Sequence, residues 1–195
     1  TLKFLDSQIK DFPDLFTLGI DGKLSNHYDL KKGTYKIGSK SIKYSEMIKF
    51  YKKLLETYNI LFIEDGLDDS DWEGWINLNI TVENSCNLIA NDVVKSSLKF
   101  LSKAIEYDIC STISVDPYRI GTITETIQII KLCQQYSMAV VLDVKNEETT
   151  ESFYSDLAVG CSVNYTKFGG MVGSEHTSKY NRLLAIENIL VDSFS

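Results

Sequence analysis

Six polar side chains in this sequence come directly after short apolar runs, at the points where buried strands would end. They are Asp21, Glu64, Asn91, Asp116, Asp143 and Lys167. The run at residues 60–63, which precedes Glu64, is continuously apolar, as in strands that are buried on both faces. Because parallel strands bring their carboxyl ends to one edge of a sheet, these side chains can converge on one site. Carboxylates and amides gathered there can bind a cation, and a lysine beside them can bind an anion.

The first three of these residues suggest a cation site. Asp21, Glu64 and Asn91 offer oxygen atoms from three successive strand ends, and Mg²⁺ prefers oxygen ligands while keeping positions open for water and substrate. The sequence therefore predicts a magnesium site at these residues; the alternative is that they only bond to backbone amides. Lys167, close to Gly169 and Gly170, is a candidate for holding an anionic substrate group, the alternative being a solvated lysine.

Strand and helix patterns alternate along the chain and would position these side chains. Strands are expected at residues 16–20, 60–63, 87–90, 112–115, 138–142 and 163–165. Between them lie helical patterns, including one that begins near Ser45 and one that Ser96 or Ser97 can cap. Thr122 and Glu125, three residues apart, are typical of a capping box at the start of a helix. The polar residues 31–40 are expected to be a surface excursion.

Six strand and helix repeats predict parallel βα units, and hence an α/β fold. Because each strand end carries a polar residue, a TIM-type (β/α) barrel is favoured. A closed barrel has eight strands, so residues 1–195 are expected to be one partial barrel domain with about six of them. The first barrel strands and any N-terminal domain would then lie outside this chain. A doubly wound sheet is the alternative, with the polar ends meeting at one switch point.

The composition narrows the class of protein. Hydrophobic residues make up 44% of the 195, so the chain can bury a sizeable core without disulfides. Asp and Glu outnumber Lys and Arg by 27 to 20, which argues against nucleic acid or a membrane surface as the partner. The four cysteines are widely spaced, so free thiols are expected. No signal peptide or spanning segment is seen, and a cytoplasmic location fits best.

Several stretches of the chain resemble motifs of the enolase family. FIED at residues 62–65 and DSDWEGW at 69–75 are similar to the family's SIEDPF and DDWEAW, and RIGTITET at 119–126 is similar to QIGTxTE. DLAVG at 156–160 and KYNRLLAIE at 179–187 follow in the family's order. The resemblance implies the family's C-terminal barrel and phosphopyruvate hydratase chemistry, the glycolytic interconversion of 2-phosphoglycerate and phosphoenolpyruvate. It also implies Mg²⁺ as cofactor, a phosphorylated acid as substrate, and dimers in the cytoplasm.

The resemblance assigns roles to three of the strand-end residues. Asp21 and Glu64 match two of the family's metal ligands, and Lys167 matches the second active-site lysine, in the motif IKTG. Asn91 stands at the first aspartate of the family's GDDL, which is the third metal ligand. The resemblance therefore implies a metal site that has lost one negative charge.

Other positions depart further from the family. Asp116 stands where the catalytic base, the lysine of LLLKVNQIGT, is expected. In the family's SHRSGET, Val144 replaces the substrate histidine, Lys145 the arginine and Asn146 the serine. A carboxylate is ordinarily a much weaker base than an amine, and a positioned base contributes about 10² to 10⁴ in rate. Lys145 keeps a positive charge but loses the bidentate fork for phosphate.

These departures leave three interpretations. The first is a phosphopyruvate hydratase domain by descent whose own catalysis is weak or absent, in which Asp116 restores the charge that Asn91 removes and a divalent cation still binds. The second is a non-catalytic binding or scaffolding pseudoenzyme that pairs with a true enolase subunit, as a homo- or heterodimer of the enolase type. The third is a different carboxylate chemistry that uses Asp116 as its base.

Overall fold

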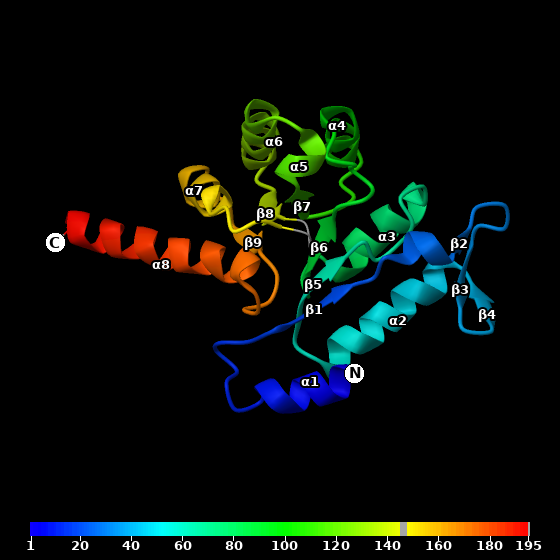
Figure 1. Ribbon diagram of the computed structural model, residues 1–195. Helices are drawn as coiled ribbons and strands as arrows, with labels where there is room; N and C mark the ends of the chain where they lie inside the picture. The colour runs from blue at the N-terminus through cyan, green and yellow to red at the C-terminus, as the bar shows by residue number, and fades with distance from the viewer. Residues whose placement is uncertain (145–147, 195) are drawn as a thin grey trace. The chain divides into compact units, whose positions relative to one another are not determined.

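The computed structural model describes residues 1–144 and 148–194, and it divides into two compact units, Thr1–Thr112 and Ile113–Ser195 (Figure 1). Six strands form a sheet whose hydrogen-bonded neighbours follow the order β1-β5-β6-β7-β8-β9. This order follows the chain without reversal, as in a βα barrel, whereas a doubly wound sheet would reverse at its switch point. The predicted α/β class with six successive parallel-type units is therefore confirmed.

The first unit carries three strands of this sheet, a small separate sheet, four α-helices and one 3₁₀ helix. Its elements are α1 (Leu2–Ile9), β1 (Leu18–Asp21), the 3₁₀ helix η1 (Leu24–His27), β2 (Tyr28–Asp29), β3 (Thr34–Ile37), β4 (Lys40–Ile42), α2 (Tyr44–Thr57), β5 (Ile60–Glu64), α3 (Trp72–Val82), β6 (Asn87–Ala90) and α4 (Leu98–Glu106). β5 pairs in parallel with β1 on one side and β6 on the other, and the register places Asp21 opposite Glu64. Ile63, Trp75 and Leu88 are fully buried between the strands and helices of this unit.

The second unit repeats the same alternation. Its elements are β7 (Thr112–Val115, beginning at the last residue of the first unit), α5 (Pro117–Ile120), α6 (Ile123–Gln135), β8 (Ala139–Asp143), α7 (Phe153–Gly160), β9 (Tyr165–Lys167) and α8 (Ser174–Phe194). β8 pairs in parallel with β9, and the register places Asp143 opposite Lys167. Ile130, Val140 and Phe168 are fully buried here.

The six predicted strands are all present; β6 and β7 have the predicted bounds, and the other four have shifted ends. β9 begins at Tyr165 rather than at Val163, because the Asn164 side chain bonds to the neighbouring strand: its Oδ1 accepts the Val140 amide at 2.9 Å. Asp21, Glu64, Asp143 and Lys167 are the last residues of their strands, and Asn91 and Asp116 directly follow theirs. All four cysteines are free thiols, as predicted. Among the described helices, none is long and apolar enough to cross a membrane.

Residues 31–40 are mostly exposed, as expected of a surface excursion. They also contain strand β3 and belong to a three-stranded antiparallel sheet, β2-β3-β4, that the sequence did not predict. Thr34 to Ile37 alternates polar and apolar side chains, and Gly38, at a φ of 60°, supports the reversal into β4. The Tyr35 side chain is fully buried. The small sheet therefore buries an aromatic ring, although its sequence is rich in lysine.

The predicted N-cap at Thr122 is present at the start of α6, but only half of the predicted capping box forms. The Glu125 amide donates to Thr122 Oγ1 at 3.2 Å, and Thr122 Oγ1 donates to Glu125 Oε2 at 2.7 Å. The glutamate therefore bonds to the threonine hydroxyl instead of to its amide. Ser97 occupies the N-cap position of α4, but its side chain makes no capping bond.

Replacing Thr122 by alanine is expected to lower the free energy of unfolding by about 1 kcal/mol, because the Glu125 amide loses its acceptor at the end of the helix. Urea unfolding followed by circular dichroism measures the change. Ser97→Ala is the matched control and is expected to have little effect, since Ser97 makes no such bond. Equal losses in the two variants would contradict the assignment of Thr122 as the stabilising cap.

Candidate functional site

The first unit brings the three predicted metal ligands onto neighbouring strands. Glu64, at the end of β5, is 6% exposed, and its Oε1 accepts a hydrogen bond from Asn91 Nδ2 at 2.9 Å. Asp21, opposite Glu64 in the register of β1 and β5, has Lys23 Nζ 3.7 Å from its Oδ2. The structure therefore places Asp21 and Glu64 side by side and bonds Glu64 to Asn91.

The oxygen atoms of these three residues can bind a hard cation, but the three side chains together carry only two negative charges. Two carboxylates and one amide oxygen are ligands that Mg²⁺ accepts. Within the described residues, no group of three or more His, Cys, Asp or Glu side chains is arranged to hold a metal, and Asn91 is not one of these residue types. The Asn91 Nδ2 is directed at Glu64, and the atom of this side chain that can act as a cation ligand is its amide oxygen.

Asp65 is a further residue of this region that the sequence interpretation left without a role. It has a φ of 44° and is 3% exposed, and its carboxylate accepts the backbone amides of Asn91 and Asp92 at 3.0 and 3.1 Å. Asp65 thus fixes the backbone that carries Asn91. The acidic residue after Glu64 was visible in the sequence, but its direction toward the β6 end was not.

Burial is the main cause that raises the pKa of the Asp65 carboxyl, from its ordinary 3.8 to about 7. The amide hydrogen bonds from Asn91 and Asp92 oppose this shift, and the charges of Asp92 and Glu64 add to it. In the metal-free protein, Asp65 therefore exchanges its proton near neutral pH.

The free energy of unfolding of Asp65→Asn, relative to that of the parent protein, is expected to increase by about 2 kcal/mol between pH 5 and pH 8. The folded state holds this proton more tightly than the unfolded state, so the parent's stability falls as pH rises from about 4 to about 7 and then levels off. Asparagine keeps an acceptor for both amides and tolerates a positive φ. Urea unfolding in the presence of a chelator at both pH values measures the difference.

Asp108→Asn is the matched control for this prediction. Asp108 also has a positive φ, of 48°, but its side chain is exposed. Asp108→Asn is therefore expected to change the free energy of unfolding by the same amount at pH 5 and at pH 8. If Asp65→Asn behaved like this control, the carboxyl of Asp65 would not be titrating near neutral pH in the folded state.

In the second unit, Asp116 has a structural task. It is 6% exposed and is the N-cap of α5, where its Oδ1 accepts the amides of Tyr118 and Arg119 at 2.9 and 3.3 Å. Pro117 at the first helical position completes a standard helix start. The carboxylate is thus oriented by backbone donors at the end of β7.

Lys167 and Asp143 lie next to each other at the ends of β9 and β8. The Lys167 ammonium is 4.0 Å from Asp143 Oδ2, and Ser114 Oγ lies 3.5 Å from the same oxygen. The Lys167 side chain is 42% exposed, so its charge is accessible to solvent while it stays near a carboxylate. The predicted substrate residues Lys145 and Asn146 lie outside the described residues.

A buried lysine that the sequence interpretation did not single out ties the segment after β8 to α8. Lys179 has no exposed surface; its Nζ donates to the carbonyls of Thr149 and Glu175 and lies 3.2 Å from Glu148 Oε2. A buried charge with three partners is expected to be costly to disrupt. Lys179 therefore ties Glu148 and Thr149 to α8.

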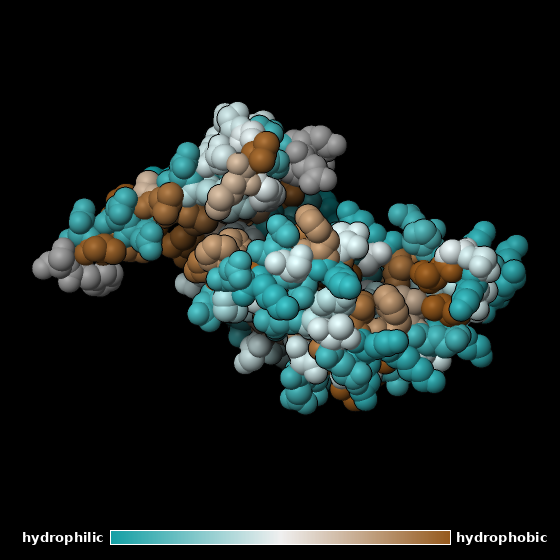
Figure 2. All heavy atoms as spheres, turned by 90° about the horizontal axis from the view of Figure 1, so that it is seen from below, coloured by the Kyte–Doolittle hydropathy of each residue, from teal (hydrophilic) through white to brown (hydrophobic). Residues whose placement is uncertain are grey.

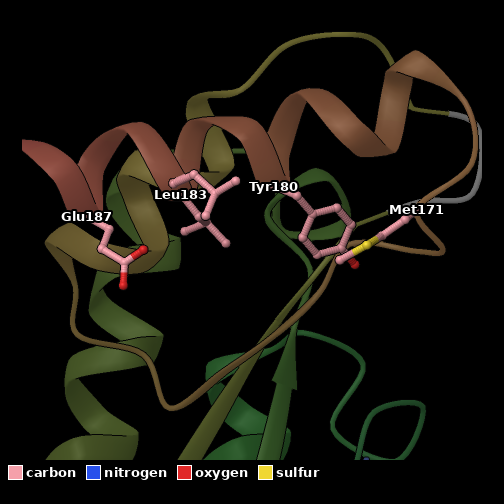
Figure 3. Close-up of a pocket in the computed structure, with 5 residues that line it drawn as sticks. Met171, Tyr180, Leu183 and Glu187 are labelled. Carbon is pink, nitrogen blue, oxygen red and sulfur yellow. The ribbon is translucent and has the colours of Figure 1, made fainter. Parts of the chain in front are cut away.

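Two pockets of the described structure do not contain the predicted site residues. One lies along α8 and is lined by Met171, Tyr180, Leu183, Leu184 and Glu187; Figure 3 shows Tyr180, Leu183 and Glu187 projecting from one side of the helix. The other is lined by Gly22, Leu24, His27, Lys36, Ile37 and Gly38, and so begins next to Asp21.

Comparison with known proteins gives consistent matches. The family model of the enolase C-terminal TIM barrel domain matches residues 14–194. The enolase of Neorickettsia sennetsu is 32% identical over 191 residues, which are 98% of this chain and 46% of that protein. The enolase of Metallosphaera sedula is 36% identical over 171 residues, covering 88% of this chain and 41% of that protein.

The enolase of Helicobacter pylori is 35% identical over 171 residues, covering 88% of this chain and 38% of that protein. The chain thus spans less than half the length of these curated relatives. The family model covers nearly the whole sequence, in agreement with the unreversed strand order and the polar strand ends. The chain therefore belongs to the enolase family and corresponds to its C-terminal TIM barrel domain.

Proposed function

We propose that this chain is a phosphopyruvate hydratase domain by descent that retains a weakened magnesium site and has weak or no hydratase activity of its own. In this proposal residues 1–195 are one partial barrel domain of a cytoplasmic, dimeric, glycolytic type of protein. Its ligand is a small phosphorylated acid.

The observation that best supports the proposed low activity is the residue type and environment of Asp116. By its resemblance to the family, this position should hold the lysine that removes the substrate proton. Here it holds a nearly buried carboxylate whose Oδ1 accepts two backbone amides. A carboxylate is ordinarily a much weaker base than an amine, and its negative charge would face a negatively charged substrate. At about 4 Å, such a pair is unfavourable by roughly 4 kcal/mol with an effective dielectric constant near 20.

Asp21, Glu64 and Asn91 are proposed to hold the cation. Magnesium bound there would supply positive charge to the oxygen atoms of the substrate acid. Asp21 and Glu64 come from adjacent strands, and Asn91 is held against Glu64 by its amide nitrogen. With two carboxylates instead of three, the affinity for a divalent cation is expected to be lower than in the family.

Lys167, with Lys145 and Asn146, is proposed to contact the phosphorylated acid. The ammonium of Lys167 is accessible while Asp143 holds it near the end of β8. Lys145 offers one charged group where the family has a bidentate guanidinium, so phosphate recognition is expected to be weaker.

Two measurements on the whole protein test this function. Isothermal calorimetry with Mg²⁺ or Mn²⁺ is expected to show saturable binding, and a steady-state assay is expected to show little formation of phosphoenolpyruvate. Absence of saturable cation binding would remove the metal site from the proposal. Turnover at the level of an ordinary enolase would overturn the proposed loss of activity.

A second candidate function is a scaffolding role in which the domain assembles with a true enolase subunit. The observation that favours it is the set of exposed apolar side chains on and before α8: Met171, Val172, Leu184, Ile189 and Val191. Figure 2 shows hydrophobic surface along this helix. Sedimentation of the purified protein mixed with an active enolase is expected to reveal a mixed complex if this role is correct.

A further inference from the structure

The loop at residues 65–71, which joins β5 to α3, is held by a tyrosine from the small β2-β3-β4 sheet. The Tyr35 hydroxyl donates to Asp71 Oδ2 at 2.7 Å and accepts the Asp68 amide at 3.0 Å. Tyr35 is fully buried and its ring lies against Tyr28, with centroids 4.7 Å apart. One side chain therefore bonds both to the middle and to the end of the loop.

Two other buried aromatic groups hold the same loop. The Tyr51 hydroxyl, from α2, donates to the Gly66 carbonyl at 2.9 Å, and Trp75 Nε1, from α3, donates to the Asp68 carbonyl at 2.9 Å. Those two groups belong to the helices that flank β5, whereas Tyr35 belongs to the separate β2-β3-β4 sheet. The small sheet therefore contributes a hydrogen-bonding group to a loop of the barrel.

The hydroxyl of Tyr35 is kept in its donating form. Burial, followed by the hydrogen bond to Asp71, raises the pKa of Tyr35 well above its ordinary value. The proton therefore stays on the tyrosine throughout the physiological range, and the carboxylate of Asp71 can accept from Tyr35 and, through Oδ1, from the Gly74 amide.

The other end of this loop reaches the candidate cation site. Asp65, its first residue, accepts the amides of Asn91 and Asp92, and its own amide donates to the Ile89 carbonyl at 3.1 Å. Glu64 immediately precedes it, and the Glu64 carbonyl accepts the Gly22 amide at 2.8 Å. A change in the loop's path would thus move the carboxylate that fixes the backbone of Asn91.

We propose that Tyr35 is a positioning residue for the cation site: it sets the path of residues 65–71 and, through Asp65, the placement of Asn91 beside Glu64. This inference rests on the proposed function for its effect on cation affinity, but not for its effect on the loop. It gives the small β2-β3-β4 sheet a role in the site.

The test compares Tyr35→Phe with Tyr44→Phe in the whole protein. Tyr44 also donates to a carboxylate near the start of α3, Glu73 Oε1 at 2.8 Å, but it is partly exposed and its acceptor lies outside residues 65–71. The first readout is calorimetric Mn²⁺ affinity, which is expected to weaken about tenfold in Tyr35→Phe and to stay within twofold of the parent in Tyr44→Phe.

The second readout is hydrogen exchange at the amides of Asn91 and Asp92, measured by NMR without metal. These amides are expected to exchange about tenfold faster in Tyr35→Phe, while amides in β1 keep their parent rates. A merely structural role would speed exchange uniformly and leave Mn²⁺ affinity of the folded protein unchanged, which would overturn the proposal.

The two readouts separate the two proposals. If the parent protein binds no Mn²⁺, the metal site of the proposed function fails, and the exchange rates alone decide whether Tyr35 positions the loop. If Tyr35→Phe does not fold, Asp71→Asn is the second variant, because its remaining oxygen can still accept the Gly74 amide while Tyr35 loses its carboxylate partner. Parent exchange rates at Asn91 and Asp92 in Asp71→Asn would overturn the inference.

Discussion

Formation of phosphoenolpyruvate by the protein that contains this chain is expected to be about 10² to 10⁴-fold slower than in an ordinary enolase. That range is the usual contribution of a positioned general base, and the position that resembles the family's base lysine holds Asp116. The absorbance of phosphoenolpyruvate in a steady-state assay with excess Mg²⁺ measures the rate. Turnover within tenfold of an ordinary enolase would contradict the expectation.

Asp116→Asn distinguishes low activity from a different chemistry. Asparagine keeps an oxygen that can accept the Tyr118 and Arg119 amides, so the start of α5 is expected to survive. If Asp116 acts only as a helix cap, any residual rate is expected to stay the same or to rise, because the substitution removes a negative charge that repels the acidic substrate. A loss of tenfold or more would show that the Asp116 carboxylate is a working base and would favour the third interpretation of the sequence.

Asn91→Asp is expected to bind Mg²⁺ or Mn²⁺ about ten to a hundred times more tightly than the parent protein. A third carboxylate restores one negative charge near the cation, and at contact distance such a charge is worth a few kcal/mol even with strong screening. Calorimetric titration with Mn²⁺ measures the change. An affinity equal to the parent's would place the cation elsewhere.

The same substitution is expected to destabilise the metal-free protein by about 1 kcal/mol. The hydrogen bond from Asn91 to Glu64 would be replaced by two carboxylates at close range. Asn87→Asp is the matched control: it adds the same charge to the other end of β6, where Asn87 Nδ2 lies 3.4 Å from the Leu61 carbonyl. Asn87→Asp is expected to leave the cation affinity unchanged.

Local patterns in the sequence were sufficient for the order of the six strands of the main sheet and the alternation of strands and helices, but not for the small β2-β3-β4 sheet. Continuous apolar runs predict strands such as β5 and β6 because burial on both faces selects for them, and the spacing of Thr122 and Glu125 predicts the start of α6. Parallel pairing then places Asp21 beside Glu64, because neighbouring strands end at one edge. The family motifs led to the same fold and to the family that the comparisons confirm.

Local patterns could not predict the contacts between side chains that are distant in sequence. Tyr35 reads as one aromatic residue in a lysine-rich segment, yet it bonds to Asp68 and Asp71, more than thirty positions along the chain. From the sequence, Asp116 is a candidate base, and only the structure shows that it caps α5.

Asp65 illustrates the physical reason most clearly. Its type and place after β5 were plain in the sequence, but its raised pKa comes from burial and its partners come from another strand. Sequence by itself determined which residues reach the strand ends, because strand burial and chain direction are local properties. The tertiary structure decided which of them are buried, bonded and oriented, because these depend on neighbours that the chain brings together only by folding.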